Sequence, residues 1–266
     1  IRVGFMAEDK VYDGNAVATV RDFVFPGVIP DDALEMAAAT AHFAESRVGA
    51  WAVTIDDGFA VTGNDDGNYA LAFAEVTAQI KARTTEVTFT ADDKVYDGTR
   101  NATVHGFAFT NLIDGDALEM AAATAHFAES KVGKWAVTID DDYAVTGNDD
   151  GKYTIAFAGV QASITPKAIT VGFTADNKVY DGNTAATVRD FVFPGVIDGD
   201  AMAMAAATAS FAESKVGAWL VTIDDFTVTG NDEDNYQINF ADNVTASITP
   251  KAITVGFSAD DKVYDG

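Results

Sequence analysis

The chain has 266 residues, a formal net charge of −24 and no cysteine. A surface this acidic repels nucleic-acid phosphates and anionic lipid headgroups, and the missing cysteine excludes disulfides and cysteine-ligated metals. No apolar run approaches the roughly 20 residues that a membrane-spanning helix needs, so this segment is not expected to cross a bilayer.

The pentapeptide Lys-Val-Tyr-Asp-Gly recurs at a fixed spacing. Its tyrosines are Tyr12, Tyr96, Tyr180 and Tyr264, each 84 residues apart (96 − 12, 180 − 96, 264 − 180). The tryptophans Trp51, Trp135 and Trp219 keep the same step. A period of this length indicates a tandem array of structural repeats.

The repeat boundaries are placed at two prolines one period apart, Pro166 and Pro250. They define repeats at 1–82, 83–166 and 167–250, with 251–266 as the start of a fourth. The first and last fourteen residues are the same piece of the repeat, which suggests an excerpt from a longer repetitive protein. The connections are short, so neighbouring repeats are expected to abut in an elongated array.

Each repeat is predicted to be mostly β. In the third copy, residues 169–173, 236–240 and 244–248 alternate apolar and polar side chains, which is typical of half-buried strands. Further strands are expected at 186–193, 219–223 and 226–228, separated by turns rich in Gly, Asp and Asn. The third copy is one residue shorter near Asp225, a change that is expected in a surface turn.

An alanine-rich segment at 116–130 fits two structures. Its intrinsic propensity favours a helix, whereas Leu118 and Met120 alternate as strand residues do. The residues alone leave both open.

Four sequence blocks in a fixed order resemble the YDG-type repeat domain. The blocks are Lys-Val-Tyr-Asp-Gly, Phe-Ala-Glu-Ser-Lys-Val-Gly, Thr-Gly-Asn-Asp-x-x-(Asn/Lys)-Tyr and Ser-Ile-Thr-Pro-Lys-Ala-Ile-Thr-Val. This family and the related MBG domains occur in tandem in large, filamentous-haemagglutinin-like bacterial surface adhesins. The resemblance implies an exported, mostly β module with strands in the alanine-rich segment. The alanine content departs from the family pattern and leaves open a short helix, as in β-grasp folds.

The pentapeptide itself is expected to be structural. Its residues are Tyr12, Asp13, Gly14, Tyr96, Asp97, Gly98, Tyr180, Asp181 and Gly182. The tyrosine is expected to bury its ring, the aspartate and glycine to form the turn, and the lysine to keep its ammonium in water. On this interpretation Tyr180→Ala destabilises its own repeat by a few kcal/mol, as a large core truncation does. A ligand hook is the alternative.

The tryptophans have two interpretations. One per repeat beside a Val-Thr-Ile strand favours a core or inter-repeat packing role. A row of exposed indoles would instead suit stacking on sugar rings.

Acidic turns provide the only candidate metal ligands. They contain Asp56, Asp57, Asp65, Asp140, Asp141, Asp142, Asp149, Asp224, Asp225 and Asp232. Calcium takes six to eight oxygen ligands from flexible loops, but none of these turns matches an EF-hand, and solvated turns are the simpler interpretation. Calcium is therefore a candidate cofactor that would stiffen the array.

The sequence gives little support for enzymatic catalysis. The carboxylates lie in turns that recur in every repeat, and no phosphate loop, zinc-protease helix or nucleophile elbow is present. The recurring lysines leave open an internal isopeptide bond, which intact mass would detect.

Together these features predict a non-enzymatic stalk or filament segment of a secreted, cell-surface adhesin. Its expected partners are neighbouring repeats of the same chain and like chains in a filament. The alternative is a weak glycan- or protein-binding module that acts by avidity.

Overall fold

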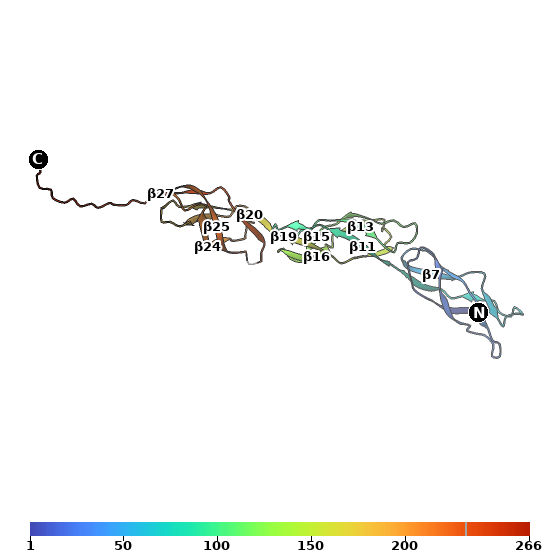
Figure 1. Cartoon of the computed structure of the whole chain (residues 1–266). Helices are drawn as coiled ribbons and strands as arrows, with labels where there is room; N and C mark the ends of the chain where they lie inside the picture. Colours follow the sequence, from blue (N-terminus) through green and yellow to red (C-terminus); the bar gives the residue numbers. More distant parts are fainter. Residues whose placement is uncertain (232) are drawn as a thin grey trace. The chain divides into compact units, whose positions relative to one another are not determined.

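The computed structural model describes residues 1–231 and 233–266, and these residues form strands but no helix (Figure 1). The chain divides into two compact units. The first contains residues 1–92, 101–127 and 136–161, and the second contains 93–100, 128–135 and 162–266. Repeat 1 thus lies in the first unit, repeat 3 in the second, and repeat 2 contributes to both. In the described residues there is no helix long and apolar enough to span a membrane.

Repeat 1 is built of ten strands. They are β1 (Arg2–Ala7), β2 (Lys10–Val11), β3 (Val17–Ala18), β4 (Val20–Val24), β5 (Glu35–Ala38), β6 (Ala41–Phe43), β7 (Gly49–Ile55), β8 (Ala60–Thr62), β9 (Ala72–Phe73) and β10 (Val76–Lys81). One sheet has the order β4-β1-β9, a second has the order β2-β10-β7-β6-β3, and β5 pairs with β8. Within these sheets β1 runs parallel to β9, and β10 runs parallel to β2.

The core of repeat 1 lies between its two larger sheets. Phe5 of β1 packs with Phe43 of β6, Val53 of β7 and Ile80 of β10 in one buried cluster. In β10 the buried Ala78 and Ile80 alternate with exposed neighbours. Because successive side chains of a strand point to opposite faces, this alternation buries one face of each sheet. Fully burying a side chain of this kind contributes about 1.5–3 kcal/mol.

Repeats 2 and 3 follow the same plan. Repeat 2 has β11 (Arg83–Ala91), β12 (Lys94–Val95), β13 (Val104–Phe109), β14 (Glu119–Ala122), β15 (Ala125–Phe127), β16 (Gly133–Ile139), β17 (Ala144–Thr146), β18 (Tyr153–Phe157) and β19 (Val160–Thr165). Repeat 3 has β20 (Lys167–Ala175), β21 (Lys178–Val179), β22 (Ala185–Ala186), β23 (Val188–Val192), β24 (Ala203–Phe211), β25 (Gly217–Thr229), β26 (Tyr236–Phe240) and β27 (Thr245–Thr249). The sheet orders β23-β20-β26 and β21-β27-β25-β24-β22 reproduce those of repeat 1.

The alanine-rich segment forms strands. Residues 119–122 are β14, and 203–211 are β24. The strand interpretation is confirmed, and the β-grasp alternative is wrong because the described residues contain no helix. Alanine's helix propensity is a weak preference, and pairing with a neighbouring strand overrides it here.

The length change in repeat 3 lies in paired strands and not in a surface turn. In repeats 1 and 2 two short strand pairs are separated by a turn, whereas β24 and β25 form one long pair. Thr208 pairs with Asp225 and Ala209 with Ile223, with a register shift between them. Losing one residue therefore turns the connecting turn into a β-bulge, a feature that a ladder accommodates. The surface-turn prediction is wrong for this copy.

The segment 251–266 forms no strand, although it was expected to be the first strand of a fourth repeat. The matching residues 1–14 contain β1 and β2, which pair with β4, β9 and β10 of their own repeat. In residues 251–266 no partner strand is paired with this segment, and the Phe257 side chain is 93% exposed. A single strand without a ladder leaves its backbone groups to water.

Candidate functional site at the repeat junctions

The Lys-Val-Tyr-Asp-Gly turn is organised around its lysine. Lys10 Nζ donates hydrogen bonds to Asn15 O at 3.0 Å, Asn15 Oδ1 at 2.9 Å and Val17 O at 3.0 Å. The ammonium also lies 2.7 Å from Asp13 Oδ1, and the lysine side chain is only 17% exposed. The expectation of an ammonium in water is therefore wrong: the lysine lies against Phe43 and ties the turn together.

The same turn forms in repeats 2 and 3. Lys94 pairs with Asp97 at 2.7 Å, and Lys178 pairs with Asp181 at 2.8 Å. The glycine after the aspartate has a positive φ in each copy, for example +82° at Gly14. Glycine adopts this conformation without steric cost, which explains why it ends the motif. Burial and hydrogen bonding oppose each other at Asp13, and the bonds prevail and lower its pKa.

Tyr12 lies at the junction between repeats 1 and 2, within the first unit. Its side chain is 5% exposed, and burial, followed by the neighbouring Asp116 of repeat 2, raises the pKa of its hydroxyl. Tyr153 donates a hydrogen bond to the same carboxylate at 2.8 Å, and its ring meets Tyr12 edge to face with centroids 5.8 Å apart. The Ile113 amide donates to the Tyr153 hydroxyl at 2.8 Å. Two tyrosines from different repeats therefore meet beside one aspartate.

A lysine completes this first junction. Lys152 Nζ lies 3.1 Å from Asp116 Oδ1 and 5.7 Å from the centroid of the Tyr12 ring. Burial raises the pKa of Asp116, but hydrogen bonds from Tyr153, Lys152 and Tyr12 outweigh it and lower the pKa. Hydrogen bonds from Lys152 and Tyr153 therefore hold the carboxylate in its charged form.

The second junction, within the second unit, repeats this geometry. Tyr96 is 6% exposed and donates to Asp200 Oδ2 of repeat 3 at 2.9 Å. Tyr236 donates to the same oxygen at 2.6 Å, and the two rings meet edge to face with centroids 5.4 Å apart. Burial, followed by the Asp200 hydrogen bond, raises the pKa of Tyr96 and of Tyr236 to about 12. We call Tyr12–Asp116–Tyr153 and Tyr96–Asp200–Tyr236 the junction triads.

Two further contacts support the second triad. Lys131 of repeat 2 lies 3.0 Å from Glu233 Oε1 of repeat 3. The Val132 amide donates a hydrogen bond to Asn235 Oδ1, also at 3.0 Å. Asn235 occupies the position that Lys152 has in repeat 2, immediately before the triad tyrosine.

The third copy of the motif is not covered by a following repeat. Tyr180 is 42% exposed, although Lys178 keeps its hydrogen bonds to Asn183 and Ala185. The expectation that Tyr180 buries its ring is therefore wrong, and it holds for Tyr12 and Tyr96. The turn folds without the junction, and burial of the tyrosine comes from the next repeat.

Sequence reasoning missed the partners of the motif tyrosine. They are Asp116 and Tyr153 for Tyr12, and Asp200 and Tyr236 for Tyr96; Asp32 and Tyr69 hold the same positions in repeat 1. The aspartates keep the 84-residue step of the motif (116 − 32, 200 − 116), and this recurrence is the signal that could have found them. An asparagine holds each tyrosine: Asn148 exchanges hydrogen bonds with the Tyr153 backbone at 2.8 and 2.9 Å.

The tryptophans are half-buried on the sheet surface. Trp51 packs against the edge of the repeat 1 core and donates its indole N–H to Arg47 O at 2.7 Å. Trp135 and Trp219 make the same bond to Lys131 O and Lys215 O. A Cβ at Gly49 would lie 3.1 Å from the Trp51 ring, so the glycine allows the indole to lie flat. The three indoles are therefore only partly buried, and each is fixed to its own repeat by one hydrogen bond.

The candidate calcium ligands do not converge. Among residues 1–231 and 233–266, no three His, Asp or Glu side chains group as a metal ion would require. Asp140 accepts hydrogen bonds from Thr124 at 2.7 Å and lies 2.5 Å from His126 Nδ1, and Asp56 lies 2.6 Å from His42. Asp224 accepts from Ser210 at 2.9 Å. These carboxylates hold the strand ends together, and Asp232 lies outside the described residues.

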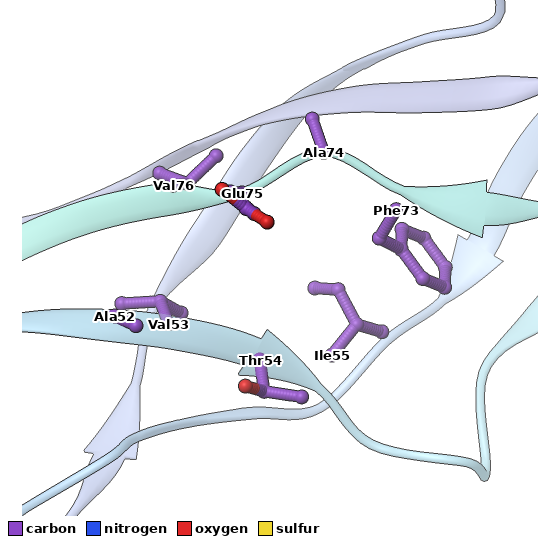
Figure 2. A pocket seen from close by; sticks show the side chains of 8 residues that line it. All are labelled: Ala52, Val53, Thr54, Ile55, Phe73, Ala74, Glu75 and Val76. Atoms are coloured by element: carbon purple, nitrogen blue, oxygen red, sulfur yellow. The ribbon is translucent and has the colours of Figure 1, made fainter.

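A shallow pocket recurs in repeats 1 and 2. In repeat 1 it has a volume of about 220 Å³ and lies where β7 separates from the segment that joins β9 to β10. Figure 2 shows Ile55 and Phe73 at one end and Ala52, Val53 and Val76 at the other. The pocket of repeat 2, about 230 Å³, is lined by the matching Ile139 and Phe157.

Fold and junctions together define a protein of tandem β-repeats that dock through matched side chains. The sequence model of the YDG domain matches residues 2–78, 81–162 and 165–246, and the chain belongs to this family. The search of curated proteins found no match. Two solved structures share little with the chain. The I9–I11 tandem of titin is 9% identical, with a TM-score of 0.23, over 94% of this chain and 100% of the titin chain. N-cadherin EC1–4 from Drosophila is 8% identical, with a TM-score of 0.25, over 94% and 75%.

Proposed function

We propose that this chain is a structural segment of a bacterial cell-surface adhesin, a stalk that carries a binding region away from the cell. The observation that carries the proposal is the junction triad. Each unit contains one: Tyr96 donates a hydrogen bond to Asp200 of the next repeat, and the buried ring of Tyr12 packs edge to face against Tyr153 of the next repeat beside Asp116. A spacer needs joints that resist bending, and a buried side-chain contact provides this where a flexible linker does not.

The chain connection strengthens the same argument. β10 ends at Lys81 and β11 begins at Arg83, so a single residue separates the two strands. A connection this short restricts the orientations that consecutive repeats can adopt. In a linear array each repeat is stabilised by its own core and by its neighbours, so adding repeats adds reach without weakening the whole.

Composition fits an exported, non-enzymatic role. The charge of −24 keeps long arrays soluble and opposes lateral aggregation. The absence of cysteine makes folding independent of the redox state of the compartment. The proposal assigns no catalytic step to the chain, since the carboxylates of the junctions and turns already serve as structural acceptors.

Small-angle X-ray scattering tests the proposal. The protein is measured in EDTA and then in calcium at about 1 mM, a level suited to extracellular modules. A stiff rod in both conditions supports a spacer whose rigidity comes from protein contacts. A chain that is compact or freely bending in EDTA contradicts it, and straightening on addition of calcium would direct attention to the turn at 140–142.

A repeated binding module is the second candidate. The pocket that recurs beside Phe73 and Phe157 and the half-exposed indoles are the features that favour it. Weak contacts repeated along one chain bind by avidity, so glycan-array binding that rises steeply with repeat number would support this function. Tryptophan fluorescence that is unchanged by any bound glycan would count against it.

A further inference from the structure

The strands through which the chain enters and leaves a repeat lie in parallel pairs. In repeat 3, β20 runs parallel to β26 over five residue pairs, from Lys167↔Tyr236 to Val171↔Phe240. β21 runs parallel to β27, the strand that ends next to the boundary at Pro250. Repeat 2 has the same two pairings, β11 with β18 and β12 with β19. Both ends of the repeat are therefore held by strands that run in the same direction.

This strand direction determines how tension between the ends of a repeat acts on its hydrogen bonds. Tension pulls β20 from its amino end and pulls β27, with β26 behind it, from its carboxyl end. In a parallel pair these pulls are opposite and lie along the strands, so all bonds of the pair are loaded together. A hairpin pulled at its open end is instead loaded one bond at a time, and a single bond is weak.

The core adds to this resistance. If β20 slid along β26, it would remove Ile169 and Val171 from the core, where their side chains are 4% and 0% exposed. Forced unfolding is governed by the unfolding barrier, and here the first step breaks several bonds and exposes apolar surface together. A high barrier is therefore expected when the repeat is pulled between its ends.

The second parallel pair is made by the Lys-Val-Tyr part of the recurring motif. The Tyr180 amide donates a hydrogen bond to Thr249 O at 2.8 Å, and the Thr249 hydroxyl donates to Lys178 O at 3.2 Å. Asn177 Oδ1, just before β21, accepts a hydrogen bond from the Ser247 amide at 2.7 Å. Repeat 2 makes the same three bonds. The motif thus holds the last strand at the point where the chain leaves the repeat.

We propose that each repeat is a force-bearing clamp, in which the parallel pairs corresponding to β20–β26 and β21–β27 resist tension applied between the ends of the repeat. The motif then has a second role: its backbone holds the last strand of its own repeat, while its tyrosine ring meets the next repeat. The biological use of the clamp rests on the proposed stalk function, because a stalk that attaches a cell to a surface carries tension.

Optical-tweezers pulling on repeat 3 within the whole chain tests the proposal. The chain has no cysteine, so introduced cysteine pairs give unique attachment points. Pro166→Cys with Pro250→Cys applies tension between the ends of the repeat, whereas Ala203→Cys with Thr229→Cys separates the paired ends of β24 and β25. All four positions are exposed. At equal loading rate the unfolding force is expected to be several-fold higher for the proline pair. Equal forces, or a higher force across β24 and β25, would overturn the proposal.

Two matched alanine-to-proline variants locate the clamp, because proline has no amide hydrogen and each variant removes one backbone bond. Ala241→Pro removes the bond to Val171 O, 3.0 Å long, at the end of the β20–β26 pair. Ala212→Pro removes the bond to Leu220 O, 2.9 Å long, beside the β24–β25 pair. Ala241→Pro is expected to lower the unfolding force between the ends, and Ala212→Pro to leave it unchanged. Equal decreases in both variants would refute the assignment of the load to the parallel pairs.

The outcome is independent of the scattering test of the stalk. Scattering measures the stiffness of the folded chain at rest, whereas pulling measures the resistance of one repeat to unfolding. A low unfolding force in a stiff chain would overturn the clamp alone. A high unfolding force in a freely bending chain would contradict the stalk and leave the clamp in place.

Discussion

The two junctions use the same triad but differ in what surrounds it. Tyr96 donates to an aspartate that also accepts from a tyrosine of the following repeat, and Tyr12 lies beside the corresponding pair, Asp116 and Tyr153. At the first junction Lys152 adds an ion pair to Asp116 and lies over the ring of Tyr12. At the second junction Asn235 takes the place of that lysine, and Lys131 and Glu233 pair beside the triad instead.

The comparison shows that the tyrosine–aspartate triad is common to both junctions, whereas the flanking residues can be exchanged. A partly buried carboxylate needs its hydrogen bonds, and the tyrosine of the following repeat supplies one in both cases. The flanking charges lie nearer to solvent, where an ion pair contributes less. We therefore expect the triad to carry most of the junction's stability and the flanks to adjust it.

Removing the motif tyrosine is expected to have the largest effect. Tyr96→Ala or Tyr12→Ala should destabilise the adjoining repeats by about 3–5 kcal/mol, as truncation of a large buried aromatic does. Tyr180→Ala should cost about 0.5 kcal/mol because that ring is partly exposed. Hydrogen exchange with peptide-level resolution measures both, since a multi-repeat chain need not unfold in one step. Equal losses at Tyr96 and Tyr180 would contradict the assignment of Tyr96 to a junction.

Alkaline pH is expected to open the two junctions in sequence. A raised tyrosine pKa favours the neutral form in the folded state, so its contribution is complete below about pH 10 and lost as the pH rises further. At the second junction the loss should extend to about pH 12, the pKa of Tyr96 and Tyr236. The pKa of Tyr12 is also raised, but Lys152 opposes the rise, so the first junction should open at lower pH.

Difference titration by tyrosinate absorbance measures this order. Subtracting the curve of Tyr96→Phe from that of the wild type isolates the second junction, and Tyr12→Phe isolates the first. If both difference curves had midpoints near the ordinary tyrosine value of about 10, the burial of the triads would be refuted.

Exchanging the flanking residue should have a smaller effect. Lys152→Asn places the second junction's residue in the first and removes the ion pair with Asp116, with an expected loss of about 1 kcal/mol. The remaining stability of the first junction should become less sensitive to salt. Urea denaturation at low and high ionic strength measures this, and an unchanged salt dependence would show that Lys152 does not stabilise the junction.

Lys131→Ala should have the smallest effect. Its ion pair with Glu233 is more than a third exposed on both sides, so we expect a smaller loss of stability than for any of the other variants. Lys215→Ala is a matched control, because Lys215 holds the same position in repeat 3 and pairs only loosely, at 3.9 Å, with Glu213. A loss at Lys131 as large as that at Tyr96 would mean that the flank, and not the triad, holds the second junction.

Periodicity in the sequence predicted the fold well. Alternation at 169–173 and 236–240 marked strands that the structure contains as β20 and β26. The alanine-rich segment remained ambiguous because propensity and alternation disagree there, and only the pairing of β24 with β25 decides it. The bulge at Asp225 could not be predicted, since a missing residue looks the same in the sequence whether it shortens a turn or shifts a ladder.

The motif tyrosine was recognised, but its location was not. Burial of Tyr96 depends on Asp200 and Tyr236, which lie more than one period further along the chain. A motif of five residues cannot reveal whether its ring is covered by its own repeat or by the next. The structure supplies that distinction, because the turn is nearly the same in three copies while the tyrosine is buried in two of them and exposed in the third.

The central claim is that the following repeat buries the motif tyrosine, and nitration with tetranitromethane followed by peptide mass spectrometry tests it most directly. Under native conditions Tyr180 and Tyr264 should be modified while Tyr12 and Tyr96 are protected, and denaturation should remove the difference. Modification of all four at similar rates in the native chain would contradict the account.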